Sequence, residues 1–526
     1  MLKDTQDALW TRRFCWLVLG VLGFRLLYLA AAVDFELAGD EAYYWDWGRQ
    51  PDWCYFSKPP LIGWIMGALR VCFGYHWWVV KAAAAFFAAG TSTMMFLLGR
   101  QLYDSRTGFF GALLMLVTPA FTLLSFALTI DAPLLLCWSA ALLFAWRAIS
   151  SPNFGRWSTL VLVTGIGVLA KQMMLVFPVL LLGYLAISRQ HRPLLKSIGP
   201  WSSTLAILAF MTPVVWWNQQ HGWATLKHTA EHFEGAHEGA PGVMGLLEFI
   251  GKQAGMYAII AWGAAIAALV VTLKNWKNAS SADRFLCVFS LPGLVVVAIM
   301  AMRQPVNENW PGVYYISAFV LAVSVLPRLL KSALWTGAAL SVAVHVLLPL
   351  LNPLGLTGSK FDFLKDMRGF SAAGNEIGAM LSAVPRPEQT FVYVLGHRYN
   401  ASQLAFHLPQ HPRVYRWNAS TIPESQYEIW PGAQDKVGWD AVIIQPQEGN
   451  TADPDREVPY LVEWNFTKVE RIGSVEIPIG KQANRVFNVF LGHTMIRWPE
   501  PEAIQLQKHP RLQQLYLRKG RQMPTS

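Results

Sequence analysis

The sequence predicts an α-helical protein that crosses a membrane many times and ends in a small α/β domain. Hydrophobic residues make up 53% of the 526 residues and charged residues only 14%, which is rare among soluble globular chains. Apolar runs of about 20 residues, the length of one helix across hydrocarbon, recur as far as Leu351. After residue 352 the composition changes to prolines, charges and short β-rich runs.

The apolar runs are interpreted as about eleven transmembrane helices within a membrane domain of residues 1–352. The first run is too long for a cleaved signal sequence, so we expect it to be retained. The approximate spans are 14–33, 77–98, 108–128, 132–149, 158–170, 172–188, 200–217, 251–272, 285–302, 312–326 and 333–351.

The connections between these runs alternate in charge, and basic connections face the cytoplasm. The basic set includes the N-terminus and the connections near Arg100, Arg147, Arg189, Lys274 and Arg328. The other set is predicted to face outward and comprises 34–76, the point around Asp131, 218–252 and 303–311. With an odd number of spans, residues 353–526 also lie outside, and their β-rich runs predict an extracytoplasmic α/β domain.

The formal net charge of +10 raises the question of a nucleic-acid partner. The Lys and Arg residues fall between apolar runs, however, where they would face the cytoplasm and anionic lipid. We therefore predict membrane lipid, and no nucleic acid, as the partner of this charge. The 24 Trp residues fit belts at the two membrane interfaces.

The first outer loop, 34–76, carries the adjacent carboxylates Asp40 and Glu41. Just beyond a helix end, a carboxylate can sit at the mouth of a water-filled cavity without burial at mid-membrane. Neighbouring residues on a helix point about 100° apart, so we expect different roles. We predict Asp40 as a general base toward a hydroxyl group and Glu41 as a contact for a sugar or a cation. The alternative is an ordinary solvated loop start or helix N-cap.

Lys58 precedes two prolines, which hold it on a stiff, extended backbone beside the membrane surface. An ammonium there can bind a lipid phosphate and stabilise charge that develops on a departing phosphate. Lys171 and Arg303 lie beside apolar runs on the same predicted side, and we expect them to converge with Lys58 into one anion site, oriented by the carboxylate of Asp131. Snorkelling to the interface is the alternative for the three basic residues.

Aromatic rings and amides in the outer connections can stack on a sugar or hydrogen-bond to it. The predicted sugar or acceptor contacts are Tyr43, Tyr44, Tyr55, Asn218, Asn309 and Trp310. Interface anchoring is the alternative for the tryptophan. His228 and His232 have a spacing that binds metal on a helix, but no third ligand is evident, and we interpret them as a solvated face. A divalent metal remains a hypothesis without assigned ligands.

Five motifs follow one another along the membrane part. They begin at Gly39 (GDEAYYW), Tyr55 (YFSKPP), Asp131 (DAPL), Leu169 (LAK) and Asn309 (NWP). In this order they resemble bacterial relatives of the protein O-mannosyltransferases, a family that includes the lipid A aminoarabinose transferases. The resemblance covers roughly the whole membrane part, and the first two motifs are its most specific element.

The resemblance implies a GT-C glycosyltransferase fold, a dolichyl- or undecaprenyl-phosphate sugar donor and inversion at the anomeric carbon. It also implies that Asp40 is the essential acidic residue, that Lys58 and Lys171 lie beside the donor phosphate, and that Asp131 is a further acidic cavity residue. Ser57 departs from the aminoarabinose branch, which usually has Glu before the motif lysine. A neutral or differently substituted sugar is therefore favoured.

We therefore predict an enzyme of the bacterial inner membrane that moves a sugar, at the periplasmic face, from a polyprenyl phosphate to lipid A, lipopolysaccharide or another envelope glycolipid. Transfer to protein Ser or Thr is one alternative. A lipid-linked-sugar flippase is another, although it should distribute charges across the membrane. If the acceptor is a phosphate, no base is needed. Asp40 would then position the sugar or balance the positive charge that develops on the sugar ring during transfer.

Overall fold

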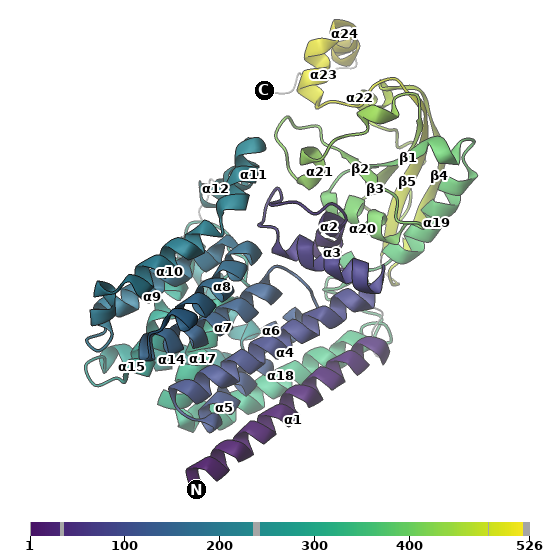
Figure 1. Ribbon diagram of the computed structural model, residues 1–526. Helices are drawn as coiled ribbons and strands as arrows, with labels where there is room; N and C mark the ends of the chain where they lie inside the picture. The colour runs from purple at the N-terminus through teal and green to yellow at the C-terminus, as the bar shows by residue number, and fades with distance from the viewer. Residues whose placement is uncertain (1, 32–35, 235–241, 482, 519–526) are drawn as a thin grey trace.

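The computed structural model describes residues 2–31, 36–234, 242–481 and 483–518 (Figure 1). Within these residues, six helical segments are long and apolar enough to cross a membrane. They contain α1 (Leu2–Ala31), α4 (Trp77–Leu102), α7 (Asp131–Ser150), α10 with α11 (Ile198–Ala209, Thr212–Gln220), α15 with α16 (Ser281–Val288, Leu291–Ala301) and α18 (Leu330–Leu350). The predicted class, a multi-pass helical membrane protein, is confirmed.

The predicted count of about eleven spans is not confirmed. Three predicted spans are apolar helices shorter than 18 residues in the described chain. They are α8 (Phe154–Ala170), α9 (Val176–Ile187) with the turn before it, and α17 (Gly312–Val325). Hydropathy detects an apolar run, but the length of the helix within that run depends on where the backbone turns.

Two other predicted spans are interrupted. The run at 108–128 divides into α5 (Ser105–Leu116) and α6 (Pro119–Leu124), because the Thr118 side chain caps a new helix that Pro119 opens. The run at 251–272 combines parts of α13 (Gly242–Met256) and α14 (Ile259–Lys274), which meet at 113°. Ala258 has a backbone φ of 57° at this break. The pair makes a seventh span only if it is counted as one.

The connections predicted to be cytoplasmic contact one another at one end of the helices. Arg100 donates to Asp7 at 2.6 Å, and the Tyr103 hydroxyl donates to Asp283 at 2.5 Å. These bonds join the N-terminal segment, the connection after α4 and the start of α15. The N-terminus and the C-terminal sheet lie at opposite ends of the molecule (Figure 1). This arrangement supports the predicted grouping of the connections.

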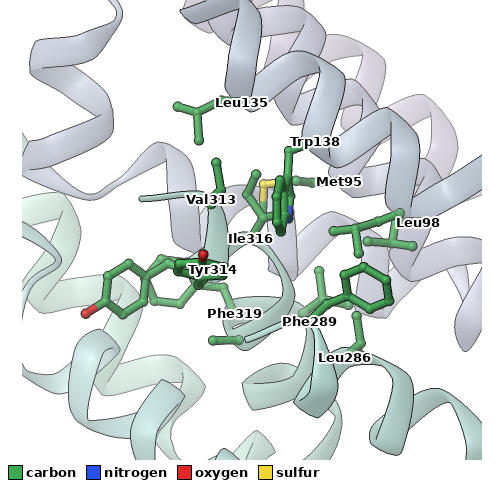
Figure 2. Close-up of a cluster of buried hydrophobic side chains, with 14 of the residues drawn as sticks. Met95, Leu98, Leu135, Trp138, Leu286, Phe289, Val313, Tyr314, Ile316 and Phe319 are labelled. Atoms are coloured by element: carbon green, nitrogen blue, oxygen red, sulfur yellow. The ribbon is translucent and has the colours of Figure 1, made fainter. Parts of the chain in front are cut away.

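The centre of the helical part packs around α17 (Figure 2). Trp138 of α7 is fully buried and meets the rings of Tyr314 and Phe177 edge-on, at centroid distances of 5.6 and 5.3 Å. A helix that is apolar on every face needs neighbours all round it, and every residue at 312–323 is buried. This packing fixes the start of α17, immediately after the connection that carries Asn309.

The residues after Asn352 form an α/β domain, as predicted. Its five-stranded sheet has the order β2-β1-β3-β5-β4, with β1 parallel to β2 and β3 and with β5 antiparallel to β3 and β4. The strands are β1 (Thr390–Leu395), β2 (Val414–Trp417), β3 (Asp440–Gln447), β4 (Phe466–Pro478) and β5 (Asn484–Met495). The helices are α19 (Phe370–Ala383), α20 (Arg398–His407), α21 (Gln426–Ile429), α22 (Tyr460–Glu463), α23 (Glu502–Lys508) and α24 (Pro510–Arg518).

The first outer loop folds into α2 (Gly39–Arg49) and α3 (Leu61–Phe73), and the C-terminal domain packs directly on it. Trp45 of α2 is 2% exposed and meets the ring of Phe406 in α20 edge-on at 4.9 Å. Gln403 of α20 donates to the carbonyl of Leu37 at 2.6 Å. One continuous apolar core therefore joins the loop to the domain, and residues of α20 can reach the loop motifs (Figure 1).

Candidate active site

Four of the predicted site residues gather where the ends of several helices meet. The pKa of Lys58 is lowered to about 8, chiefly by burial and then by the charge of Lys171, while the charges of Asp40 and Asp131 oppose this shift. These four side chains therefore lie within electrostatic reach of one another. Lys58 is half-buried in a bend between α2 and α3, where its carbonyl oxygen accepts from the backbone N–H of Tyr55 at 3.0 Å, so the extended backbone expected at this residue is not formed. Two ammonium groups and two carboxylates thus share one partly desolvated site.

Asp131 is the structural centre of one half of this charged cluster. It opens α7, where the positive end of the helix dipole favours a carboxylate, and it is 5% exposed. One oxygen accepts from the Lys171 ammonium at 2.9 Å, and the other accepts from the Asn309 amide at 2.6 Å. Lys171 follows the last residue of α8. Three connections from distant parts of the sequence are therefore joined by one carboxylate, which holds the ammonium in place.

Asp40 lies in the first turn of α2 and belongs to the other half of the cluster. Its Oδ1 accepts a hydrogen bond of 2.8 Å from the hydroxyl of Tyr399 in α20. Burial and the Asp40 charge raise the pKa of Tyr399 to about 12, so this hydroxyl remains a donor at neutral pH. Gly39 allows the approach, because a Cβ there would lie 2.6 Å from the Tyr399 ring.

Tyr44 lies among these charges. Its side chain is 4% exposed, and its pKa is raised well above the ordinary value by burial and then by the charges of Asp40, Tyr399 and Asp131. The phenol therefore stays protonated and can offer a hydrogen bond to a bound molecule. Of the predicted sugar contacts, Tyr44 and Asn309 are the two that the structure brings to the charged cluster.

Of the two partners expected for Glu41, a sugar or a neighbouring cation, the structure shows a cation. The side chain is fully buried, and its oxygens accept from the backbone N–H groups of Leu128 and Ala38 at 2.8 and 2.9 Å. It also forms an ion pair with Lys81 of α4, which is 1% exposed. Glu41 therefore links α2 to α4 and to the connection before α7. Lys81 was missed, although a lone lysine within an apolar run is itself a signal.

Replacing Glu41 by Gln is expected to destabilise the protein strongly, because Lys81 then keeps its buried charge without this carboxylate. Breaking a buried ion pair on one side costs about 3–5 kcal/mol. The measurement is the thermal unfolding midpoint of detergent-purified protein. The control Glu41→Gln/Lys81→Met removes both charges and should recover much of the loss. An unchanged midpoint in the single variant would show that the pair is not structural.

Three predicted sugar contacts are instead buried in the framework. The Tyr43 hydroxyl accepts from the backbone N–H of Gln426 at 2.5 Å, which ties α2 to α21. The Tyr55 ring stacks on Trp47 at 4.3 Å, and its hydroxyl donates to the carbonyl of the same residue at 3.1 Å. Asn218 is 4% exposed and bonds to backbone groups of α11 and α12 (Ala224–Glu234). These side chains support the loop that presents the cluster.

Two other predicted residues lie at the margin. Trp310 is half-buried and packs against the helical core. Arg303 is exposed beyond the end of α16, and the charges that shift Lys58 include that of Arg398 but not that of Arg303. The expected convergence of Arg303 with Lys58 therefore has no support in the geometry. The run of apolar residues before Arg303 indicated the membrane side but not the direction of the side chain.

The C-terminal domain contributes two residues that sequence reasoning missed, Arg398 and Tyr399, both at the start of α20. The Arg398 guanidinium carbon lies 5.5 Å from the ring centre of Tyr43 and 4.9 Å from that of Tyr399. Its charge is among those that lower the pKa of Lys58. The motif resemblance ends near residue 350, so nothing in the tail distinguished this arginine from its neighbours.

The described residues contain no group of three or more His, Cys, Asp or Glu side chains arranged to hold a metal ion. His228 packs beside Phe56 with ring centres 4.8 Å apart, and the side chain of His232 lies outside the described residues. The carboxylates of the cluster are engaged by Tyr399, Lys171 and Asn309, as described above. A metal requirement stays a hypothesis without ligands.

The chain is similar to proteins that are named as glycosyltransferases. The family model described as dolichyl-phosphate-mannose-protein mannosyltransferase matches residues 57–217. The chain is 26% identical, over 424 residues, to the lipid A galacturonosyltransferase RgtD of Rhizobium johnstonii, and the match covers 78% of this chain and 86% of the relative.

The fold is similar to that of ArnT from Cupriavidus metallidurans. The structure bound to undecaprenyl phosphate has a TM-score of 0.59 at 14% identity, covering 91% of this chain and 98% of the other. The apo structure also gives 0.59, at 15% identity, covering 91% and 97%. This likeness extends over both the helical part and the C-terminal domain, and it shows the fold.

Proposed function

We propose that the chain is a GT-C glycosyltransferase of the protein O-mannosyltransferase and aminoarabinose transferase family, and that it transfers a sugar from a polyprenyl phosphate to lipid A or a related envelope glycolipid. The matching family model is described as a dolichyl-phosphate-mannose-protein mannosyltransferase, and this description supports a lipid-linked sugar donor. The proposal adds the acceptor, the inner-membrane location and the periplasmic direction of the site.

The observation that carries the proposal is the pairing of two lysines with two carboxylates at one end of the helices. Lys58 and Lys171 form a partly desolvated anion site, and Asp131 holds Lys171 in position. When the bond between the anomeric carbon and the phosphate breaks, its electron pair goes to the phosphate oxygen. Ammonium groups that are already in place stabilise this charge without reorganisation.

Asp40 is suited to the acceptor side of the same reaction. Tyr399 occupies one of its oxygens, and the other remains to take the proton of an acceptor hydroxyl. The acceptor oxygen attacks the anomeric carbon from the face opposite the phosphate, so the new bond forms with inversion. The polyprenyl phosphate leaves as the second product.

The acceptor class rests on the relative that is named as a lipid A galacturonosyltransferase and that matches most of both chains. The grouping of the charges also favours catalysis over transport. A transporter for an anionic lipid needs charges along a path between the two membrane faces, whereas the cluster here lies at the ends of α7, α8 and α2.

The proposal is tested in proteoliposomes that contain purified protein, lipid A and undecaprenyl phosphate carrying a hexose, a hexuronic acid or an aminopentose. We expect lipid A to gain the mass of one sugar with at least one donor, together with release of undecaprenyl phosphate. Protein with Asp40→Asn is the matched inactive control. Transfer only to Ser or Thr of an added peptide would contradict the proposed acceptor. Movement of the donor across the bilayer without transfer would contradict the proposal that the protein is an enzyme.

A further inference from the structure

A cavity of about 820 Å³ lies between the membrane helices and the C-terminal domain. Leu348 and Pro349 form its floor, in the last turn of α18, which ends below the domain in Figure 1. The start of α19 and the connection between β4 and β5 form its walls. Because α18 is long and apolar enough to span a membrane, its last turn marks the membrane surface, and the cavity adjoins that surface.

The uncharged polar groups of the cavity are suited to a sugar. Three lining side chains form no hydrogen bond within the described chain, and they belong to Asn352, Ser371 and Asn375. Thr357 also lines the cavity and is 7% exposed, and its buried hydroxyl has no partner among the described residues. Amides and hydroxyls both donate and accept, as the hydroxyl groups of a sugar require. A buried hydroxyl without a partner is unfavourable, so a bound molecule that supplies one is favoured.

The charged groups of the cavity leave one cation available. The carboxylate of Glu36 accepts from the first two backbone N–H groups of α19, at 2.8 and 3.1 Å, and Arg368 pairs with Asp362 at 3.0 Å. Lys481 lines the cavity and forms no ion pair within the part of the chain that the structure describes. An apolar floor at the membrane surface, neutral hydrogen-bonding walls and one cation together match the head group of a phosphorylated glycolipid.

The cavity is close to the acceptor side of the charged cluster. Glu36 lines it, and Asp40 follows four positions later, which is about 14 Å of chain at most. The two lysines of the cluster come from the segments after α2 and α8, and neither segment lines the cavity. The proposed transfer needs two lipids bound at once, and these lysines account for the donor alone.

We propose that this cavity binds the sugar head group of the acceptor glycolipid, with the acyl chains directed along α18 into the membrane. This inference rests on the proposed function and adds the place of the acceptor. The donor phosphate then lies beside Lys58 and Lys171, while the acceptor hydroxyl reaches Asp40 from the side of Glu36. The C-terminal domain is a substrate-binding element in this arrangement, because α19 and the connection between β4 and β5 form the walls of the cavity.

Asn375→Trp places a large ring in the cavity and removes an amide. In the proteoliposome assay we expect the KM for lipid A to rise by about tenfold or more, because the space is filled and at least one hydrogen bond is lost. The donor KM, and kcat at saturating lipid A, should stay near the wild-type values. Asn375→Ala leaves the cavity open and should raise the KM for lipid A by only about fivefold. Glu376→Trp is the matched control, because Glu376 is the next exposed residue of α19 and does not line the cavity.

Direct binding separates this inference from the proposed function. Purified protein in detergent is titrated with lipid A and, separately, with undecaprenyl phosphate. Asn375→Trp should weaken the binding of lipid A by about tenfold and leave the binding of undecaprenyl phosphate unchanged. An unchanged KM for lipid A in Asn375→Trp, or an equal loss of affinity for both lipids, would overturn the inference and leave the transferase intact. Binding of lipid A that depends on Asn375, without transfer from any donor, would support the cavity and end the proposed function.

Discussion

Asp40→Asn is expected to lower kcat by about 10²–10⁴-fold, the usual contribution of a positioned general base. The amide keeps an oxygen that can accept from Tyr399, so the start of α20 should stay in place. What disappears is the ability to take the acceptor proton as the new glycosidic bond forms. The donor KM should change little, because the lysines that we propose to bind the phosphate remain. Initial rates of sugar transfer to lipid A measure both quantities.

Tyr399→Phe is the control for this prediction, since it removes the hydrogen bond to Asp40 and keeps the carboxylate. We expect a loss of about tenfold, in line with one hydrogen bond. If Asp40→Asn retains the wild-type kcat, no base is needed. The acceptor atom would then be a phosphate oxygen, and Asp40 would act on the sugar.

Lys58→Ala is expected to have the largest effect, a fall of about 10³–10⁵-fold in kcat/KM. In the proposed complex the ammonium lies beside the donor phosphate, where a charge-assisted hydrogen bond contributes about 1.5–3 kcal/mol to binding. Losing a preplaced donor to the leaving oxygen lowers kcat by a further factor of about 10²–10³. Donor KM and kcat measured separately should both be affected. A rise in KM with an unchanged kcat would show that Lys58 contributes only to ground-state binding.

The donor affinity should also depend on pH through the same ammonium. The pKa of Lys58 is lowered to about 8 in the unliganded site. Only the protonated form attracts the phosphate, so kcat/KM should be level below that pH and fall as the pH rises through it. A bound phosphate stabilises the ammonium, so kcat alone should persist to higher pH.

Lys58→Arg is the control for the pH dependence, because a guanidinium stays charged throughout this range. Its activity should be lower, since the geometry differs, but the fall above about pH 8 should vanish. A fall of the same shape in this variant would assign the titration to another group.

The sequence by itself determined the class of the protein and most of the motif residues that meet in the site. Composition and apolar runs indicate a multi-pass membrane protein, and the alternation of charge grouped the connections whose residues are in contact. A polar group beside an apolar run is costly to bury unless it has a function. For this reason the sequence could identify five residues of the cluster: Asp40, Lys58, Asp131, Lys171 and Asn309.

Tertiary structure decided the rest. The 113° turn between α13 and α14 cannot be predicted from hydropathy, because hydropathy does not report the direction in which the chain runs. Glu41 is adjacent to Asp40, yet a helix turns the two side chains apart, and only packing shows that Lys81 is the partner of Glu41. Arg398 lies more than 300 residues from Tyr43, whose ring its guanidinium covers. This contact depends on how α20 packs against α2. Such long-range packing is set by the shapes of both surfaces, so no local sequence pattern predicts it.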